Sequence, residues 1–264
     1  MSKSIRIIKK ESKQRVNNHF GEAFIIVFVP FFIMNALNII AGQITLFLPD
    51  NIEYYVDLGI QVVLNILATY MSFKLLIPYI RGSNKLSFNN FFKLEKEFLY
   101  FGLLRIIVAG LFILMYLPVI PVFVELLKDI SVMVDPSAIE RYLETSDIIP
   151  RLAEATKITS LLLFLFWLIS IKFHMVPYII IDQKVNLMEA FKISWKISKN
   201  NYFKILIFPF TYILWMLLLI TFFGVFYVLP LVFVGYGYLY LSMIDDKTEE
   251  DYSNDDDTYI DLLT

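Results

Sequence analysis

Two cations inside apolar segments are the residues of this chain best placed to do chemistry. Lys74 interrupts the apolar run Leu58–Ile80, and Arg105 interrupts the run Phe98–Leu117. A charged side chain inside a bilayer is costly and therefore marks a candidate functional site. Each lies six or seven residues from one end of its run, which corresponds to a depth of about 9–10 Å at a helical rise of about 1.5 Å per residue.

Two interpretations of Lys74 and Arg105 remain open. In the first, they form an anion or lipid-phosphate contact that faces the helix bundle. In the second, both side chains extend to the headgroups on the cytoplasmic side and have no ligand of their own. The second interpretation is the simpler one, because both residues lie near the same predicted membrane face.

The rest of the chain offers little for catalysis or metal binding. It has no cysteine, which excludes disulfides, thiolate nucleophiles and thiolate zinc sites. Its two histidines, His19 and His174, are far apart in the sequence and lack a metal-ligand spacing. No GxSxG, GxGxxG or P-loop motif is present, and no apolar run has a carboxylate near its centre. We therefore predict no catalytic residue, no cofactor and no metal, and a protein that is not an enzyme.

A basic and aromatic segment at residues 186–199 is a further candidate site. At 100° per residue, Lys192, Lys196 and Lys199 fall on one side of a helix, and Trp195 falls among the apolar residues. A basic face opposite an aromatic-rich face is typical of a helix that lies in the membrane interface. Such a helix either frames the bundle or recognises lipid.

Similar but weaker amphipathic patterns occur at Ser4–Val16 and Ser87–Leu99. The helix at residues 186–199 also has a predicted start, because Asn186 and Glu189 have the spacing of a capping box. We predict that each of these segments forms a surface helix before a pair of transmembrane helices.

The composition places most of the chain in lipid. Hydrophobic residues make up 58% of its 264 residues and charged residues 18%, and the mean hydropathy is +0.65. Soluble domains have about 45–50% apolar and about 25% charged residues. A disordered chain is therefore excluded, and the composition argues against a soluble enzyme.

Six transmembrane helices are predicted, arranged as three hairpins in an all-α membrane bundle. Ile205–Ile244 has 40 residues without a charge, and one straight helix of that length would measure about 60 Å, twice the hydrocarbon core. We predict a hairpin there, with its turn at Phe222–Gly224. The other four predicted spans are Ala23–Pro49, Leu58–Ile80, Phe98–Leu117 and Ile158–Ile181.

The distribution of basic residues predicts cytoplasmic N- and C-termini. Lysine and arginine are concentrated in residues 1–22 and in the second and fourth loops, whereas the external loop at 122–157 has four basic and seven acidic residues. Basic residues gather on the cytoplasmic side of membrane proteins. The membrane domain is predicted at 23–244. The acidic tail at 245–264 lacks core-forming residues and is predicted to be disordered.

The C-terminal half carries a resemblance to a known family. Its residues are Pro177–Asp182, Glu189–Ser194, Phe210, Ile213, Trp215, Gly224, Pro230 and Tyr240–Leu241, together with Arg81–Gly82 further upstream. The pattern resembles the domain-of-unknown-function family numbered 975, six-helix membrane proteins found mostly in Gram-positive bacteria and distantly similar to the membrane domain of glycerophosphodiester phosphodiesterases. The chain departs from that family at Pro118–Pro121, where the family often has Pro-Gly. The resemblance implies a fold and a topology, and it brings no catalytic residue.

These observations predict a multi-pass protein of the bacterial plasma membrane without enzymatic activity. Its expected role is accessory, in transport, envelope homeostasis or protection (immunity) against cationic peptides. The alternative is a lipid- or anion-handling protein that works with a partner enzyme or transporter. The expected partners are the bilayer and an anionic lipid or a cationic peptide, and not nucleic acid. A homo-oligomer or a membrane-protein partner is left open.

Overall fold

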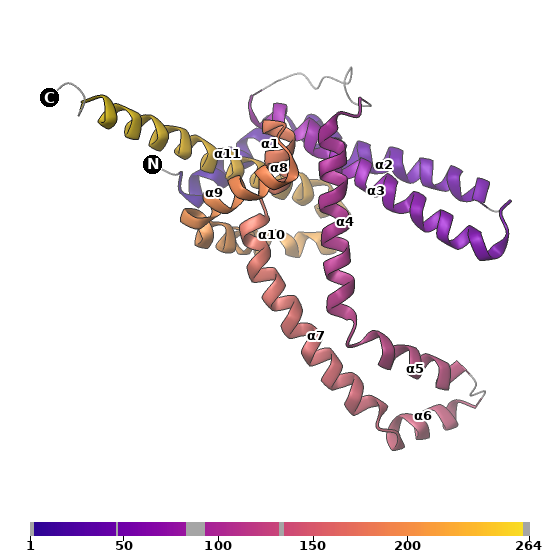
Figure 1. Ribbon diagram of the computed structural model, residues 1–264. Coiled ribbons are helices and arrows are strands. Elements are labelled where there is room, and N and C mark those ends of the chain that lie inside the picture. Colours follow the sequence, from indigo (N-terminus) through magenta and orange to yellow (C-terminus); the bar gives the residue numbers. More distant parts are fainter. Residues whose placement is uncertain (1–2, 46, 83–92, 132–134, 261–264) are drawn as a thin grey trace. The chain divides into compact units, whose positions relative to one another are not determined.

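The computed structural model describes residues 3–45, 47–82, 93–131 and 135–260, and every regular element in these ranges is a helix (Figure 1). The described part of the chain therefore has the predicted all-α class. It divides into two compact units, one formed by residues 1–102 and 172–264 and the other by residues 103–171.

The first unit contains a long helical hairpin. Helix α2 (Phe20–Thr45) and helix α3 (Asp50–Ile80) lie side by side along their lengths (Figure 1). Each contains an apolar stretch long enough to cross a membrane, and each tolerates one internal proline, Pro30 in α2 and Pro78 in α3. A proline removes one backbone hydrogen bond from a helix interior, and in lipid that loss is compensated by neighbouring groups.

Helix α1 (Ile5–Asn18) packs against helix α11 (Phe222–Ile260). Its buried residues are Ile8, Ser12 and Val16, which follow one another at a spacing of four and so share one face. The amphipathic helix predicted at Ser4–Val16 is therefore present. Of the corresponding prediction for Ser87–Leu99, residues 87–92 lie outside the described ranges, and the helix α4 begins only at Lys96.

A break in the chain separates helix α7 (Ile148–Ser170) from helix α8 (Val176–Gln183). Between them the backbone forms a short 3₁₀ helix, η1 (Ile171–Phe173). Pro177 is in the first turn of α8, where its missing N–H is tolerated. The predicted span Ile158–Ile181 is thus helical over most of its length but interrupted before its end.

Helix α9 (Leu187–Ile207) begins at the predicted cap. The side chain of Asn186 accepts a hydrogen bond of 3.0 Å from the backbone N–H of Glu189. Its buried face also anchors the break in the preceding helix, because the hydroxyls of Ser194 and Ser198 both donate to the carbonyl of Lys172, at 2.7 and 3.1 Å. These bonds satisfy a carbonyl that the interrupted helix leaves without its usual donor.

The region predicted as the fifth span is built from short pieces. After α9 the chain forms η2 (Pro209–Tyr212), α10 (Ile213–Met216) and η3 (Leu217–Ile220), and α11 then begins at Phe222. Pro209 lacks the N–H that would extend the hydrogen-bond ladder of α9, and here, unlike at Pro30 and Pro78, the α-helix ends just before the proline.

The predicted turn at Phe222–Gly224 lies at the start of α11. A Cβ on Gly224 would lie 1.7 Å from the carbonyl oxygen of Leu218, so only glycine fits where the chain folds back on η3.

Helix α11 continues beyond the apolar region to Ile260. The sequence predicts disorder from residue 245, whereas the backbone of residues 245–260 is helical in the structure. Extending an existing helix avoids the cost of nucleation, so a polar segment can be added to a helix that the apolar residues before it have already formed.

The second unit contains the part of helix α4 (Lys96–Tyr116) after Gly102, followed by α5 (Ile120–Ser131), α6 (Pro136–Thr145) and α7. Asp135 caps α6 and accepts a hydrogen bond of 3.0 Å from the N–H of Ser137. Within the external segment predicted at residues 122–157, the described residues form α5, α6 and the first part of α7, apart from the short connections between these helices.

Five helices in the described ranges are long and apolar enough to cross a membrane, and the structure is that of a multi-pass membrane protein. They cover Phe20–Thr45, Ile52–Ile80, Lys96–Tyr116, Ile148–Gln183 and Gly224–Asp245. The six-helix count is not confirmed, because residues 208–221 form no helix of that length.

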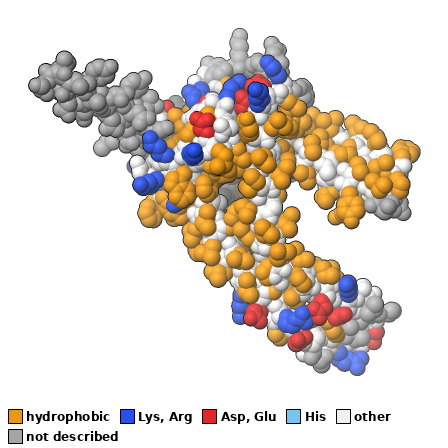
Figure 2. Space-filling view, in the orientation of Figure 1, with side chains coloured by type: hydrophobic (Ala, Val, Ile, Leu, Met, Phe, Trp, Pro, Cys, Tyr) orange, Lys and Arg blue, Asp and Glu red, His pale blue; other side chains and the backbone are white. Residues whose placement is uncertain are grey.

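Hydrophobic side chains cover the visible face of α2 and α3, and charged ones gather over α5 and α6 (Figure 2). On α2, Ile39 and Ile44 are 68% and 64% exposed. A large apolar surface of this kind is unfavourable in water and is covered by lipid in a membrane.

Candidate functional site

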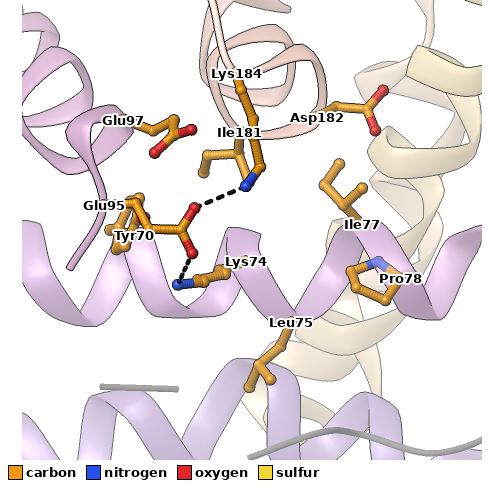
Figure 3. Close-up of a pocket in the computed structure, with 10 residues that line it drawn as sticks. All are labelled: Tyr70, Lys74, Leu75, Ile77, Pro78, Glu95, Glu97, Ile181, Asp182 and Lys184. Carbon is orange, nitrogen blue, oxygen red and sulfur yellow. Dashed lines mark hydrogen bonds and ion pairs between the residues drawn. The ribbon is translucent and has the colours of Figure 1, made fainter. Parts of the chain in front are cut away.

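A cavity of about 280 Å³ lies in the first unit, where α3, α8 and the start of α4 meet (Figure 3). One part of its wall is apolar and is formed by Leu75, Ile77, Pro78 and Ile181. The other part is charged and includes Lys74 from α3, Glu95 and Glu97 from the start of α4, and Asp182 and Lys184 from the end of α8. An apolar cavity with a few convergent polar groups is the usual form of a ligand site.

Glu95 joins the two lysines of the cavity. Its Oε1 lies 3.3 Å from the Nζ of Lys74, and its Oε2 lies 2.8 Å from the Nζ of Lys184 (Figure 3). The hydrogen bond from Lys184, followed by that from Lys74, holds the pKa of Glu95 below its ordinary value of 4.5. The same carboxylate raises the pKa of Lys184 above 10.5. Glu95 and Lys184 are therefore both charged near neutral pH.

Lys74 has further partners. Its ammonium donates a hydrogen bond of 2.7 Å to the backbone carbonyl of Lys93. It also lies 5.7 Å from the centre of the Tyr70 ring, within the range of a cation–π contact. The structure thus shows a lysine whose charge is compensated by Glu95 and by two neutral acceptors.

Lys184 occupies an unusual backbone conformation. It ends α8 with φ 55° and ψ 33°, in the left-handed region. Residues other than glycine, asparagine and aspartate seldom adopt that region. The conformation turns the chain from α8 toward α9 and leaves the side chain of Lys184 directed at Glu95 (Figure 3).

Asp182 is held by two other groups. Arg81 donates to both of its carboxylate oxygens, from Nε at 3.0 Å and from Nη2 at 2.7 Å, and the Tyr240 hydroxyl donates at 2.7 Å. The Asp182 side chain is only 6% exposed, so these bonds satisfy a nearly buried carboxylate. The resemblance quoted above includes Arg81, Asp182 and Tyr240, and the structure brings the three into contact.

Glu97 differs from the other charged residues of the cavity. The residue is 8% exposed, and its Oε2 is buried without a hydrogen-bond partner among the described residues. Its carboxylate points into the cavity, toward Ile181 and Lys184 (Figure 3). A buried carboxylate oxygen without a donor is unfavourable by about 1–3 kcal/mol or more. Among the described residues that line the cavity, Glu97 is the one with a buried side-chain oxygen that lacks a donor.

The sequence located part of this site and missed the rest. Lys74 lines the cavity, as its interpretation as a candidate site requires, but its nearest charge is a carboxylate. Arg105 lies on α4 in the second unit, where its side chain is exposed, and a joint site with Lys74 stays a prediction.

The partners of Lys74 are not evident from the sequence, because charges in loops indicate topology and do not show which distant residues meet. Glu95, Glu97 and Lys184 all lie in loops or helix ends of the predicted cytoplasmic side. A signal was nevertheless available, since Glu95 and Glu97 are carboxylates next to a span in an otherwise basic loop.

The predicted interfacial helix is formed by the first two-thirds of α9. Lys192, Trp195, Lys196 and Lys199 are all exposed and lie on the side of α9 away from its buried residues. Trp195 was predicted among the apolar residues, but it is 48% exposed and its ring lies 3.9 Å from the Lys172 ammonium. The exposed face therefore combines basic groups with one aromatic ring.

A second charged cluster lies in the second unit. Arg151 on α7 makes a two-point contact with Glu125 on α5, at 3.0 and 2.7 Å. The Tyr142 hydroxyl on α6 donates to Asp129 on α5. These pairs connect three helices, and none of their residues lines the cavity described above.

The cavity in the first unit has the size and the convergent polar groups of a ligand site. No group of three or more potential metal ligands occurs in the part of the chain that the structure describes. No family model, no curated protein and no solved structure matches the chain. The resemblance to the domain-of-unknown-function family numbered 975 therefore remains a prediction.

Proposed function

We propose that the chain is a non-enzymatic, multi-pass protein of the bacterial plasma membrane that binds lipid headgroups in the α3–α8 cavity. The observation that carries this proposal is the position of the charged wall. Lys74, Asp182 and Lys184 lie at or near the ends of two candidate spans, Ile52–Ile80 and Ile148–Gln183. Span ends lie at the level of lipid headgroups, so the cavity offers charge to a headgroup and an apolar wall to the groups beside it.

The exposed face of α9 supports the same proposal. A helix with lysines and a tryptophan on its accessible side binds membrane surfaces through charge and through insertion of the aromatic ring. Each lysine close to an anionic surface contributes about 1 kcal/mol. The face of Lys192, Trp195, Lys196 and Lys199 would hold the protein against the headgroup layer, and the cavity would select within that layer.

Lipid retention by purified protein tests the proposal. Protein in detergent is mixed with equal amounts of phosphatidylethanolamine and phosphatidylglycerol, and the lipid retained after gel filtration is measured by mass spectrometry. We expect Lys74→Gln/Lys184→Gln to retain less lipid than the wild type, because both cations of the cavity are removed. The control is Lys128→Gln/Lys157→Gln, which removes two exposed lysines elsewhere. Equal retention in all three proteins would overturn the proposal.

The topology belongs to the same proposal. We propose that residues 205–221 cross the bilayer as a broken segment, which gives six crossings and cytoplasmic termini. Single cysteines report this cleanly, because the chain has none of its own. Cysteines at Asn51 and Ser137 should react with an impermeant maleimide in intact cells, and cysteines at Ser83 and Ser253 only after permeabilisation. Labelling at Ser253 from outside would show that residues 205–244 cross only once.

Protection against cationic peptides is a second candidate function, favoured by the exposed apolar face of α5. Phe123, Val124 and Leu127 are 47%, 42% and 52% exposed, and they could receive the apolar side of an amphipathic peptide. The acidic residues around them are less available than the sequence implies, because Glu125 is paired with Arg151 and Asp129 with Tyr142.

Growth inhibition by a panel of cationic peptides, with and without the expressed protein, tests this second function. We expect neutralising Glu140, Glu144 and Asp147 to reduce protection in part and less so at high salt, since exposed charges are screened over about 8 Å at physiological ionic strength. An unchanged threshold for every peptide on expression would remove this function and leave lipid binding.

A further inference from the structure

The buried carboxylate of Glu97 limits which ligand the cavity can bind. Its Oε2 is buried and has no hydrogen-bond partner among the described residues, and the Glu97 side chain lines the cavity. The neighbouring carboxylates are already satisfied, Glu95 by two lysines and Asp182 by Arg81 and Tyr240. The cavity therefore presents one acceptor that needs a donor.

The charges around Glu97 limit what that donor can be. Lys74 and Lys184 balance Glu95 and Glu97, and Arg81 balances Asp182, so the cavity wall is close to neutral. A simple anion would approach the lysines but would also face the Glu97 carboxylate, which repels it. A divalent metal would find carboxylates that are mostly paired with cations already, and the described residues contain no cluster of three potential metal ligands. A ligand that carries both a positive and a negative group avoids both problems, because its cation can face Glu97 while its anion faces the lysines.

We propose that the cavity binds a zwitterionic headgroup in which a primary ammonium lies next to a phosphate. The ammonium donates to Oε2 of Glu97, and the phosphate lies against Lys184, whose side chain is 63% exposed and can turn toward it. This inference rests on the proposed function, and it names the class of headgroup that the same cavity prefers. Charge-assisted hydrogen bonds of this kind are the stronger ones in proteins.

The ammonium has to carry at least one N–H, because Oε2 of Glu97 needs a hydrogen-bond donor. A quaternary ammonium has no hydrogen to donate, and it is bound instead by several aromatic faces. Among the described residues that line the cavity, only Tyr70 is aromatic, and its ring already faces Lys74. The size also fits, since about 280 Å³ is slightly below the range of drug-sized ligand sites and suits a headgroup rather than a whole lipid.

Nanodiscs of defined composition test the proposal with full-length protein. The protein is offered phosphatidylethanolamine, phosphatidylcholine or phosphatidylglycerol at the same molar fraction, and retained lipid is counted by native mass spectrometry. We expect phosphatidylethanolamine to be retained best. Glu97→Gln, which keeps the shape of the side chain, should reduce that preference about tenfold. Glu154→Gln, at an exposed position on α7, should leave it unchanged.

Melting temperature and gel filtration show whether each variant is folded. If Glu97→Gln does not fold, Lys184→Gln provides the second test and should weaken phosphatidylethanolamine and phosphatidylglycerol alike. Equal retention of phosphatidylethanolamine and phosphatidylcholine would overturn the ammonium assignment. So would a preference for phosphatidylglycerol that Glu97→Gln leaves intact, although lipid binding itself would then stand. Retention that no variant alters would overturn both proposals.

The source of the ligand is settled by competition with free phosphoethanolamine. Displacement of the lipid by millimolar phosphoethanolamine would support recognition of the headgroup alone. If the free compound protects the protein against heat in detergent while no lipid is retained, the same ammonium–phosphate chemistry belongs to a soluble ligand. The absence of any effect of phosphoethanolamine or of lipid would overturn the inference.

Discussion

The two charged clusters of this protein use the same residue types for different purposes. In the first unit, Glu95 bridges Lys74 and Lys184 beside a cavity, and Glu97 leaves one buried oxygen without a partner. In the second unit, Arg151 and Glu125 satisfy each other in a two-point contact on an exposed surface. The presence of ion pairs does not distinguish a binding site from a structural connection, but a buried and unpaired acceptor next to a cavity does.

Burial explains why the two clusters should respond differently to mutation. The Asp182 side chain is 6% exposed, whereas those of Arg151 and Glu125 are 43% and 45% exposed. Breaking a buried ion pair by removing one partner is strongly destabilising, because the other partner loses its compensation. Exposed pairs contribute little. Four substitutions test this contrast, in order of decreasing expected effect.

Asp182→Ala should have the largest effect on stability. It removes the acceptor of two hydrogen bonds from Arg81 and one from Tyr240. We expect the free energy of unfolding to fall by about 2–3 kcal/mol, which is below the value for a fully buried pair because Arg81 keeps access to solvent. Thermal unfolding in detergent, followed by tryptophan fluorescence, measures the change against Glu154→Ala. A loss no larger than that of the control would contradict the role of Asp182.

Glu97→Leu should act in the opposite direction and stabilise the ligand-free protein by about 1 kcal/mol. It removes a buried acceptor that has no donor, and this gain exceeds the small loss of a favourable carboxylate at the first turn of α4. A rise in melting temperature together with a loss of lipid retention is the expected result. A marked fall in melting temperature would show that the Glu97 carboxylate supports the fold instead.

Lys184→Gln should lower stability by at most about 1 kcal/mol at neutral pH, because Lys184 is largely exposed. The pH dependence has a defined sign. The pKa of Glu95 is held below 4.5, so its contribution is complete above pH 4.5 and is lost as the pH falls through the lowered pKa. The pKa of Lys184 is raised above 10.5, so its contribution is lost as the pH rises through that raised value. The difference in melting temperature between wild type and Lys184→Gln should therefore be largest between these limits. A difference that grows below pH 4 would contradict the pairing.

Arg151→Gln should have the smallest effect of the four. It breaks the two-point contact with Glu125 but leaves both positions open to solvent. At 1 M salt, where charges are screened beyond about 3 Å, the melting temperatures of wild type and variant should coincide. A larger loss than that of Asp182→Ala would reverse the comparison between the clusters.

The sequence by itself determined the elements that depend on neighbouring residues. Asp135 and Asn186 cap helices because their side-chain oxygens reach N–H groups two or three residues further along the chain. The long apolar runs became helices α2, α3 and α4 because lipid leaves no other way to satisfy the backbone. The fifth span was less predictable. Its composition is as apolar as the others, but Pro209 and the close approach of Gly224 to Leu218 break it into short pieces.

Only the tertiary structure decided the site. Lys74, Glu95 and Lys184 are separated by 21 and 89 residues along the chain, and no periodicity predicts that one carboxylate bridges both lysines. The meeting depends on how α3, α8 and the start of α4 pack, and on the left-handed conformation that ends α8 at Lys184. The same packing buries Glu97 without a donor. Sequence patterns report which residues share a face of one helix, but the free energy that fixes the contacts between helices comes from close packing of many side chains at once.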